Sequence, residues 1–102
     1  MKSQIITEDQ LDLMHHIQED CNASQRQIAQ KTGLSIGKVN YCLKALLDIG
    51  FIKVDNFKKS NKKLNYVYIL TPMGIQEKSA ITRQFIVQKK QEYDKLMSYL
   101  NT

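Results

Sequence analysis

Two helix starts lie eleven residues apart in this chain, at Ser24 and Ser35, and one glycine separates the two segments. The Ser24 hydroxyl can accept a hydrogen bond from the backbone N–H of Gln27, whose side chain reaches back, a capping box that opens a helix. Gly33 can end this helix, because glycine readily adopts the left-handed conformation of a tight turn. Ser35 then caps a second helix that runs to Gly50. Two short helices joined by so short a turn predict a helix-turn-helix.

The second helix of this motif has an apolar face and a polar face, at about 100° of rotation per residue. The apolar face, which we expect to lie against the core, consists of Ile36, Val39, Leu43, Leu46 and Leu47. The opposite face carries Gly37, Lys38, Tyr41 and Lys44, with Asn40 on its flank. Lysine can bind guanine or phosphate, asparagine adenine, and tyrosine phosphate or a thymine methyl, while glycine permits close approach. These residue types suit the DNA major groove, although an ordinary solvated helix face offers the same types.

A basic hairpin follows the second helix. After Gly50 the apolar period changes from 3.6 to 2, which predicts strands over residues 51–54 and 66–70. The segment between them holds Lys58, Lys59, Asn61, Lys62 and Lys63 near its tip. A hairpin that directly follows a recognition helix is a wing, and a lysine-rich wing suits the sugar-phosphate backbone or the minor groove. Lysines also keep exposed loops soluble and protect sheet edges, which is the alternative interpretation.

The distribution of charge favours DNA as the partner. Residues 35–71 carry seven basic and two acidic groups, a net charge of +5. Residues 1–34 have a net charge of −2 and residues 72–102 of +2. Positive charge is therefore concentrated on the segments that would face DNA, a coincidence that solubility alone does not explain.

Four segments resemble the winged-helix transcriptional regulators of the MarR type, and within them the short bacterial group described as exopolysaccharide-associated regulators. These segments are Ser24 to Ala29, Gly37 to Leu46, Gly50 to Lys53 and Leu70 to Ile75. The resemblance spans roughly residues 7–100, and the Gly-Lys-Val-Asn-Tyr-Cys-Leu-Lys core is its specific part. It implies an α+β, mostly α fold: a winged helix-turn-helix domain with a long C-terminal helix. It also implies that the helix from Ser35 to Leu47 recognises an operator in double-stranded DNA.

We therefore expect a sequence-specific transcriptional regulator, with DNA contacts in the motif and the wing. The expected DNA-binding residues are Ser24, Gln25, Arg26, Ser35, Gly37, Lys38, Asn40, Tyr41, Lys44, Lys58, Lys59, Asn61, Lys62 and Lys63. Larger MarR-type proteins have an extra N-terminal helix and a longer C-terminal pair, which build a dimer and a small-molecule pocket. With six residues before its first helix, this chain is not expected to form that pocket in the same way, and an effector ligand stays unassigned.

The last predicted helix is too long for the domain from which it extends. Some 28 residues from Pro72 span roughly 42 Å, whereas a 70-residue globule is only about 28 Å across. The apolar residues of this helix form two adjoining stripes. We expect dimerisation through Ile75, Phe85, Ile86, Tyr93, Leu96 and Leu100. The predicted organisation is a DNA-binding domain over residues 1–71 and a dimerisation helix over 72–102, with binding to a pseudo-palindrome as a homodimer. The alternative is a helix folded back on its own domain.

Composition bounds the remaining possibilities. Of the 102 residues, 42% are apolar, which is enough for one modest core. No apolar run approaches the ~20 residues needed to span a bilayer, and the N-terminus does not resemble a secretory signal, so we expect a cytoplasmic protein. Cys21 and Cys42 lack metal-ligand spacing; we expect Cys21 to be buried and Cys42 to lie at the edge of the core. His15 and His16 point about 100° apart and cannot jointly hold a metal. No metal site or cofactor is expected.

Two other functions compete with DNA binding. A winged helix can act as a protein-interaction module without direct DNA readout, although the +5 central segment would then need an acidic partner. An enzyme is disfavoured, because the chain has no nucleophile motif, no phosphate-binding glycine loop and no carboxylate pair placed for acid–base work. Steep salt dependence would separate DNA binding from apolar docking.

Overall fold

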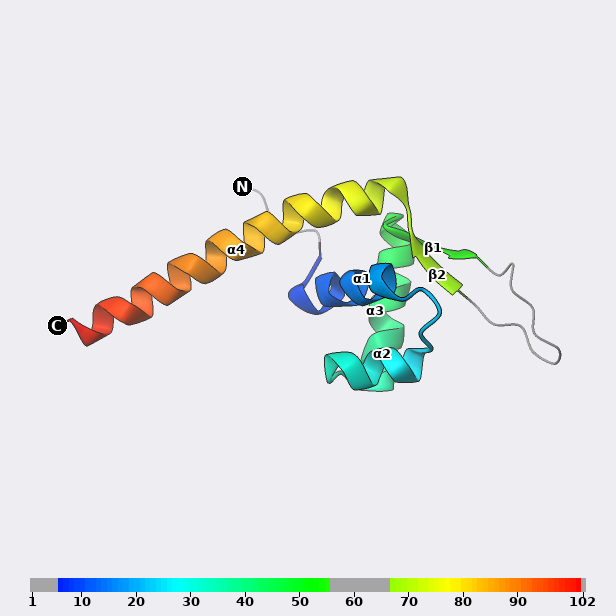
Figure 1. Ribbon diagram of the computed structural model, residues 1–102, viewed down its shortest axis with the longest axis horizontal. Coiled ribbons are helices and arrows are strands. Elements are labelled where there is room, and N and C mark those ends of the chain that lie inside the picture. The colour runs from blue at the N-terminus through cyan, green and yellow to red at the C-terminus, as the bar shows by residue number, and fades with distance from the viewer. Residues whose placement is uncertain (1–5, 56–66, 102) are drawn as a thin grey trace.

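The computed structural model describes residues 6–55 and 67–101, which form four helices and a two-stranded sheet (Figure 1). In chain order the elements are α1 (Glu8–Glu19), α2 (Gln25–Thr32), α3 (Ile36–Ile49), β1 (Ile52–Asp55), β2 (Val67–Leu70) and α4 (Pro72–Leu100). This is the mostly α winged-helix architecture expected from the sequence, including the long C-terminal helix. Among the described helices, none is both long enough and apolar enough to cross a membrane.

Polar side chains cap the starts of the first three helices, at Ser24 and Ser35 as predicted. Thr7 and Ser24 each form a capping box, with Gln10 and Gln27 respectively. The Ser35 hydroxyl accepts a hydrogen bond of 3.0 Å from the backbone N–H of Lys38 and so begins α3. The glycines at residues 33 and 50 end α2 and α3 with φ angles of +79° and +82°, the left-handed region in which other residues are strained.

One hydrophobic core joins the first three helices to the sheet and to the start of α4. From α1 and α2 it takes Leu13, Met14, Ile17 and Ile28, and from α3 it takes Val39, Cys42, Leu43 and Leu46. Phe51 and Ile52 add the start of β1, and Ile81 adds α4. Because both α1 and α2 pack against α3, the rotation of α3 about its own axis is fixed from two sides.

The two strands pair antiparallel, with Ile52 opposite Leu70 and Asp55 opposite Val67. The segment that connects them, residues 56–66, lies outside the described residues. The expected wing residues are in that segment: Lys58, Lys59, Asn61, Lys62 and Lys63. Their placement as DNA contacts therefore stays a prediction, whereas the strand pair that would carry a wing is present.

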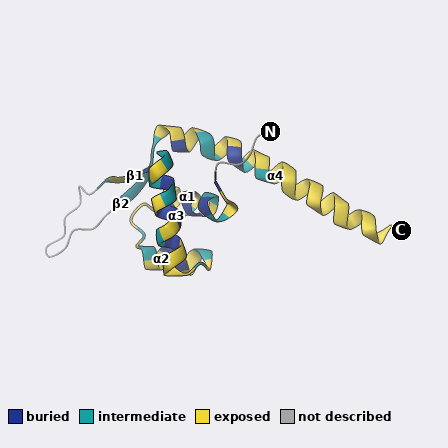
Figure 2. Cartoon of the chain, turned by 180° about the vertical axis from the view of Figure 1, so that it is seen from behind, coloured by how far each residue is buried: buried dark blue, intermediate teal, exposed yellow. Residues whose placement is uncertain are grey.

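Helix α4 leaves the domain after about four turns. Ile81 is buried and Phe85 is half-buried against the core of its own chain. From residue 86 to residue 101 every residue is exposed. The Lys89 side chain still contacts Glu8 of α1, and the turns beyond it extend away from the other elements (Figures 1 and 2). The structure therefore does not show α4 folded back along its whole length on its own domain.

Three sequence-based expectations about burial are wrong. Ile36 was expected in the core, but it lies in the first turn of α3, and 47% of its surface is exposed. Cys21 is exposed, because α1 ends at Glu19 and the helical phase that would bury it does not continue. Cys42 is fully buried instead of lying at the edge of the core, because α1 covers that flank of α3 as well. Helical periodicity gives a direction, but it does not tell how far neighbouring elements extend.

A close backbone contact connects α4 to the end of α3. The Thr71 hydroxyl donates a hydrogen bond of 2.6 Å to the carbonyl oxygen of Gly50 and accepts one of 3.0 Å from the N–H of Gly74. The Thr71 N–H donates to the carbonyl oxygen of Phe51 at 3.0 Å. Gly74 is buried so closely against Phe51 that an added Cβ would meet this carbonyl group.

Gly74→Ala is accordingly expected to lower the free energy of unfolding by about 1–3 kcal/mol, because backbone atoms cannot move aside as the end of a flexible side chain can. Gly37→Ala is the matched control, since an added Cβ there has no neighbour closer than the Ser35 hydroxyl at 4.0 Å. The control should be neutral or stabilising by up to about 1 kcal/mol. Urea unfolding of the three proteins at one concentration would measure both effects. Equal stability of the Gly74 and Gly37 variants would contradict this account of the junction.

Candidate nucleic-acid interface

One side of α3 faces solvent and carries the predicted reading residues (Figure 2). Gly37, Lys38, Tyr41 and Lys44 are all exposed, and Tyr41 exposes 64% of its surface. Asn40 is half-buried on the flank, as its helical phase predicts. Because Val39, Leu43 and Leu46 of α3 are held in the core, the polar side chains present one continuous face to a partner.

The start of α2 places a second group of predicted residues at the surface. The Ser24 hydroxyl accepts from the N–H of Gln27 at 3.1 Å, and the Ser24 N–H donates to the Gln27 side chain at 2.8 Å. Ser24 therefore stabilises the start of α2 whether or not it contacts DNA. Arg26 is exposed, Gln25 is half-buried, and Arg26 makes no ion pair with another described residue. Arg26 is thus available to bind an anion such as phosphate.

Lys38 has a partner that the sequence did not indicate. Its ammonium lies 3.9 Å from a carboxylate oxygen of Asp9 in α1, and both side chains are about half exposed. The Cys42 thiol lies close to this pair. Burial raises the pKa of Cys42, the positive charge of Lys38 lowers it, and the negative charge of Asp9 raises it. The Cys42 thiol is therefore a neutral part of the core. Asp9, in contrast, would compete with a DNA phosphate for the Lys38 ammonium.

Two further residues of the surface were missed at the sequence level. Lys53 lies exposed on β1, directly after α3, and adds a positive charge close to the predicted interface. The period-2 pattern of the strand could have placed it outward, since Ile52 beside it is buried. Ile36 was assigned to the core but stands exposed at the start of α3. No local pattern reveals that exposure.

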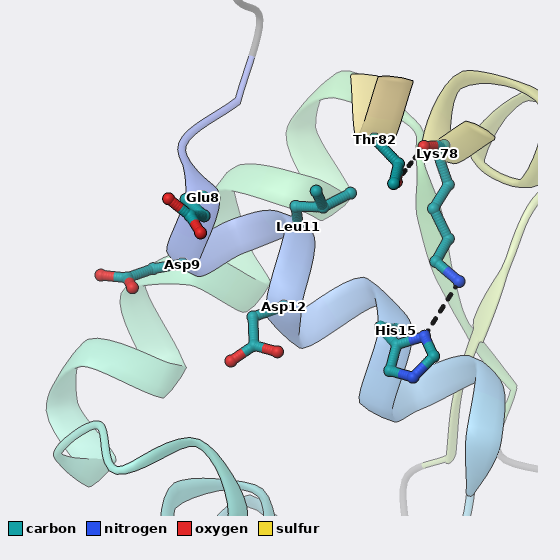
Figure 3. A pocket seen from close by; sticks show the side chains of 7 residues that line it. All are labelled: Glu8, Asp9, Leu11, Asp12, His15, Lys78 and Thr82. Carbon is teal, nitrogen blue, oxygen red and sulfur yellow. Dashed lines mark hydrogen bonds between the residues drawn. The ribbon is translucent and has the colours of Figure 1, made fainter. Parts of the chain in front are cut away.

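An open groove lies between α1 and α4 (Figure 3). It has a volume of about 770 Å³ and is lined by Glu8, Asp9, Leu11, Asp12, His15, Lys78 and Thr82. The Lys78 ammonium lies 3.1 Å from Nδ1 of His15 and donates to the Gln18 side chain at 2.6 Å.

Two of the three carboxylates of the groove pair with cations on neighbouring helices, whereas Asp12 lies 3.5 Å from His16 of its own helix. Glu8 pairs with Lys89 at 3.0 Å, and this contact raises the pKa of the Lys89 ammonium through a hydrogen bond and through charge attraction. Asp9 pairs with Lys38, as described above. These two ion pairs connect α1 to α3 and α4, and the excess of carboxylates in the groove is unsuited to DNA. Among the described residues, no group of His, Cys, Asp and Glu is arranged to hold a metal ion.

Comparison with known proteins defines the class. Residues 10–53 match the family model described as winged helix-turn-helix DNA-binding. This match covers the two motif helices and reaches into β1. No curated protein sequence matches the chain significantly.

Solved structures extend the likeness to nearly the whole chain. The transcriptional regulator SlyA superposes with a TM-score of 0.67 at 22% identity, over 95% of this chain and 72% of SlyA. A MarR/EmrR family transcriptional regulator from Acinetobacter sp. ADP1 gives 0.65 at 21% identity, over 94% of this chain and 72% of that one. Streptococcus pneumoniae FabT, in complex with DNA, gives 0.64 at 16% identity over 87% of this chain. The chain spans 61% of the length of FabT.

The chain thus has the winged helix-turn-helix fold, with α3 as the second helix of the motif. More particularly, its fold is similar to that of solved MarR-type regulators, as the sequence resemblance predicts.

Asp9→Asn should strengthen binding to duplex DNA about twofold to fivefold, because the variant frees Lys38 from an ion pair of the strength usual at protein surfaces. Asp12→Asn is the control. It removes the same charge from the same helix, but Asp12 pairs with His16, at 3.5 Å, and not with a residue of α3. Fluorescence anisotropy at fixed salt would compare the affinities. An equal gain in both variants would show that only the net charge matters, and the Lys38–Asp9 contact would have no role.

Proposed function

We propose that this protein is a sequence-specific regulator of transcription that inserts α3 into the major groove of double-stranded DNA and binds a pseudo-palindromic operator as a homodimer. The observation that carries the proposal is the solvent-facing side of α3, where Lys38, Tyr41 and Lys44 stand opposite a buried apolar face. The second helix of a helix-turn-helix commonly binds DNA in this way. The match of residues 10–53 to a DNA-binding family model supports it.

The residue types on α3 suggest a division of tasks. Asn40 can bind adenine through two hydrogen bonds, and Lys38 and Lys44 can bind guanine or phosphate. Glycine at residue 37 has no evident role within the chain, since an added Cβ would meet nothing closer than 4.0 Å. Its bare backbone is instead suited to a close approach of DNA. Arg26 and the Ser24–Gln25 end of α2 are placed for phosphate contacts, which fix orientation but do not read sequence.

The lysine-rich segment between β1 and β2 completes the proposed interface. The wing lysines, Lys58, Lys59, Lys62 and Lys63, would act mainly through phosphate charge and counterion release, because a lysine ammonium binds phosphate as a point charge. Asn61 would contact the backbone beside them. Only two residues separate the end of α3 from the start of β1, so a wing on the strand pair would reach DNA next to the recognition helix.

The projecting half of α4 supports a homodimer. Ile86, Tyr93, Leu96 and Leu100 expose 60–78% of their surfaces along this helix. So long an apolar surface is costly in water, and a second copy would cover it through the same residues. Ile75 is exposed near the start of α4 and belongs to the same proposed surface, whereas Phe85 is half-buried in its own domain and could add to an interface only in part.

Such a role needs no catalytic group and places the protein with its operator in the cytoplasm. The resemblance to exopolysaccharide-associated regulators makes exopolysaccharide genes the first targets to test. The sign of regulation and any effector ligand lie outside the proposal.

Asn40→Ala tests the reading role of α3. Loss of two hydrogen bonds to one base should weaken binding to the operator by about 1–3 kcal/mol and binding to random DNA much less. Gln84→Ala, which removes an exposed amide from α4, should change neither affinity. Competition binding with both DNAs gives the ratio. A similar loss on operator and random DNA would mean that Asn40 contacts only the backbone.

Introducing charge into the apolar stripe tests the dimer. Ile86→Glu combined with Leu96→Glu should convert a dimer into monomers, because each substitution places a charge in the buried interface. The control pair Gln84→Glu and Gln91→Glu adds the same charge on the opposite face of α4 and should remain dimeric. Sedimentation equilibrium at micromolar concentration measures the mass. A monomeric parent protein under these conditions would exclude the proposed assembly.

A further inference from the structure

Ile36 is an exposed aliphatic side chain at the start of the recognition helix. Among residues 6–55, the only large apolar or aromatic side chains with comparable exposure are Ile36, Tyr41 and Val54. Ile36 belongs neither to the buried core cluster nor to the half-buried apolar residues packed against it. Two of these three exposed side chains therefore lie on α3, the element proposed to enter DNA.

The fold gains nothing evident from isoleucine at this position. A β-branched residue is a weaker helix former than alanine, lysine or glutamate. The side chain follows directly after the Ser35 cap, in the first turn, where helices readily accept polar residues. An aliphatic group that is left in water here is better explained by a partner than by stability of the free chain.

The surroundings of Ile36 identify the chemistry of that partner. Asn40 lies one turn further along the same flank of the helix, and the bare backbone of Gly37 lies beside it. Lys38 and Lys44 make the adjacent face positive. A protein partner that docked through Ile36 would need a broader apolar patch than one side chain among lysines. The projecting half of α4, which carries most of the other exposed apolar residues, extends away from α3 (Figure 1). Isolated methyl groups on a negatively charged surface are instead a property of the DNA major groove.

We propose that Ile36 reads the C5 methyl group of a thymine in the operator, in the same half-site as an adenine read by Asn40. This deepens the proposed function and rests on it. Four residues of helix rise about 6 Å, and base pairs stack about 3.4 Å apart, so the two contacts should lie roughly two base pairs from each other. The start of α3 thus specifies A·T pairs through one apolar contact and one amide contact.

Deoxyuridine differs from thymidine only by the missing C5 methyl group. We would therefore replace the thymines of the selected operator by deoxyuridine, one at a time, to test the contact between Ile36 and this methyl group. The parent protein should lose about threefold to fivefold in affinity at one thymine per half-site, the amount expected for one buried methyl. Ile36→Ala should bind thymine and deoxyuridine operators equally at that position, because its contact is already absent. Val54→Ala removes an exposed β-branched side chain from β1 and should keep the full response to deoxyuridine.

The outcomes separate this inference from the proposed function. If no operator is enriched from a random pool of double-stranded DNA, both the proposed function and the thymine contact are wrong. A clear operator whose thymine methyl groups have no effect, or an Ile36→Ala variant that keeps the parent response, would overturn the thymine contact alone. Ile36→Ala should also retain the urea midpoint of the parent protein. A clearly lowered midpoint would show that Ile36 supports the fold and would contradict the role assigned to it.

Discussion

The packing of α3 against α1 and α2 determines what this molecule can present to a partner. Val39, Leu43 and Leu46 are fully buried against the apolar residues of the two shorter helices. Burial of one such side chain stabilises a fold by about 1.5–3 kcal/mol, so rotation of α3 about its axis would lose several of these contributions at once. The exposed side of α3 is therefore a consequence of the core. A surface that reads DNA must hold its side chains in register, and the core supplies that rigidity.

The second constraint is the junction between the end of α3 and the start of α4. Thr71, Phe51 and Gly74 connect the two helices through backbone contacts that leave no room for a side chain at residue 74. The direction of α4 relative to α3 is thereby fixed at its base. If the projecting turns pair with a second copy, this junction sets the distance between two recognition helices. Half-site spacing on DNA would then be a property of the fold as much as of the interface.

Much of this structure could be predicted from the sequence, for reasons that are local. The helix starts at Thr7, Ser24 and Ser35 are set by hydrogen bonds between residues three apart, so four adjacent residues are enough to recognise each one. What could not be predicted depends on contacts between distant segments. Asp9 beside Lys38 is such a contact, and so is the burial of Cys42. The wing lysines lie outside the described residues, and their part in binding stays a prediction.

The central claim is that α3 reads a specific duplex sequence as part of a two-fold assembly. Selection of bound fragments from a random pool of double-stranded DNA tests it most directly. The account predicts enrichment of one sequence with two inverted half-sites, whose centres lie about 10 base pairs or a multiple of that apart. Retention of all fragments without enrichment would show that the positive charge binds DNA without reading it. Retention of none would exclude DNA as the partner of this surface.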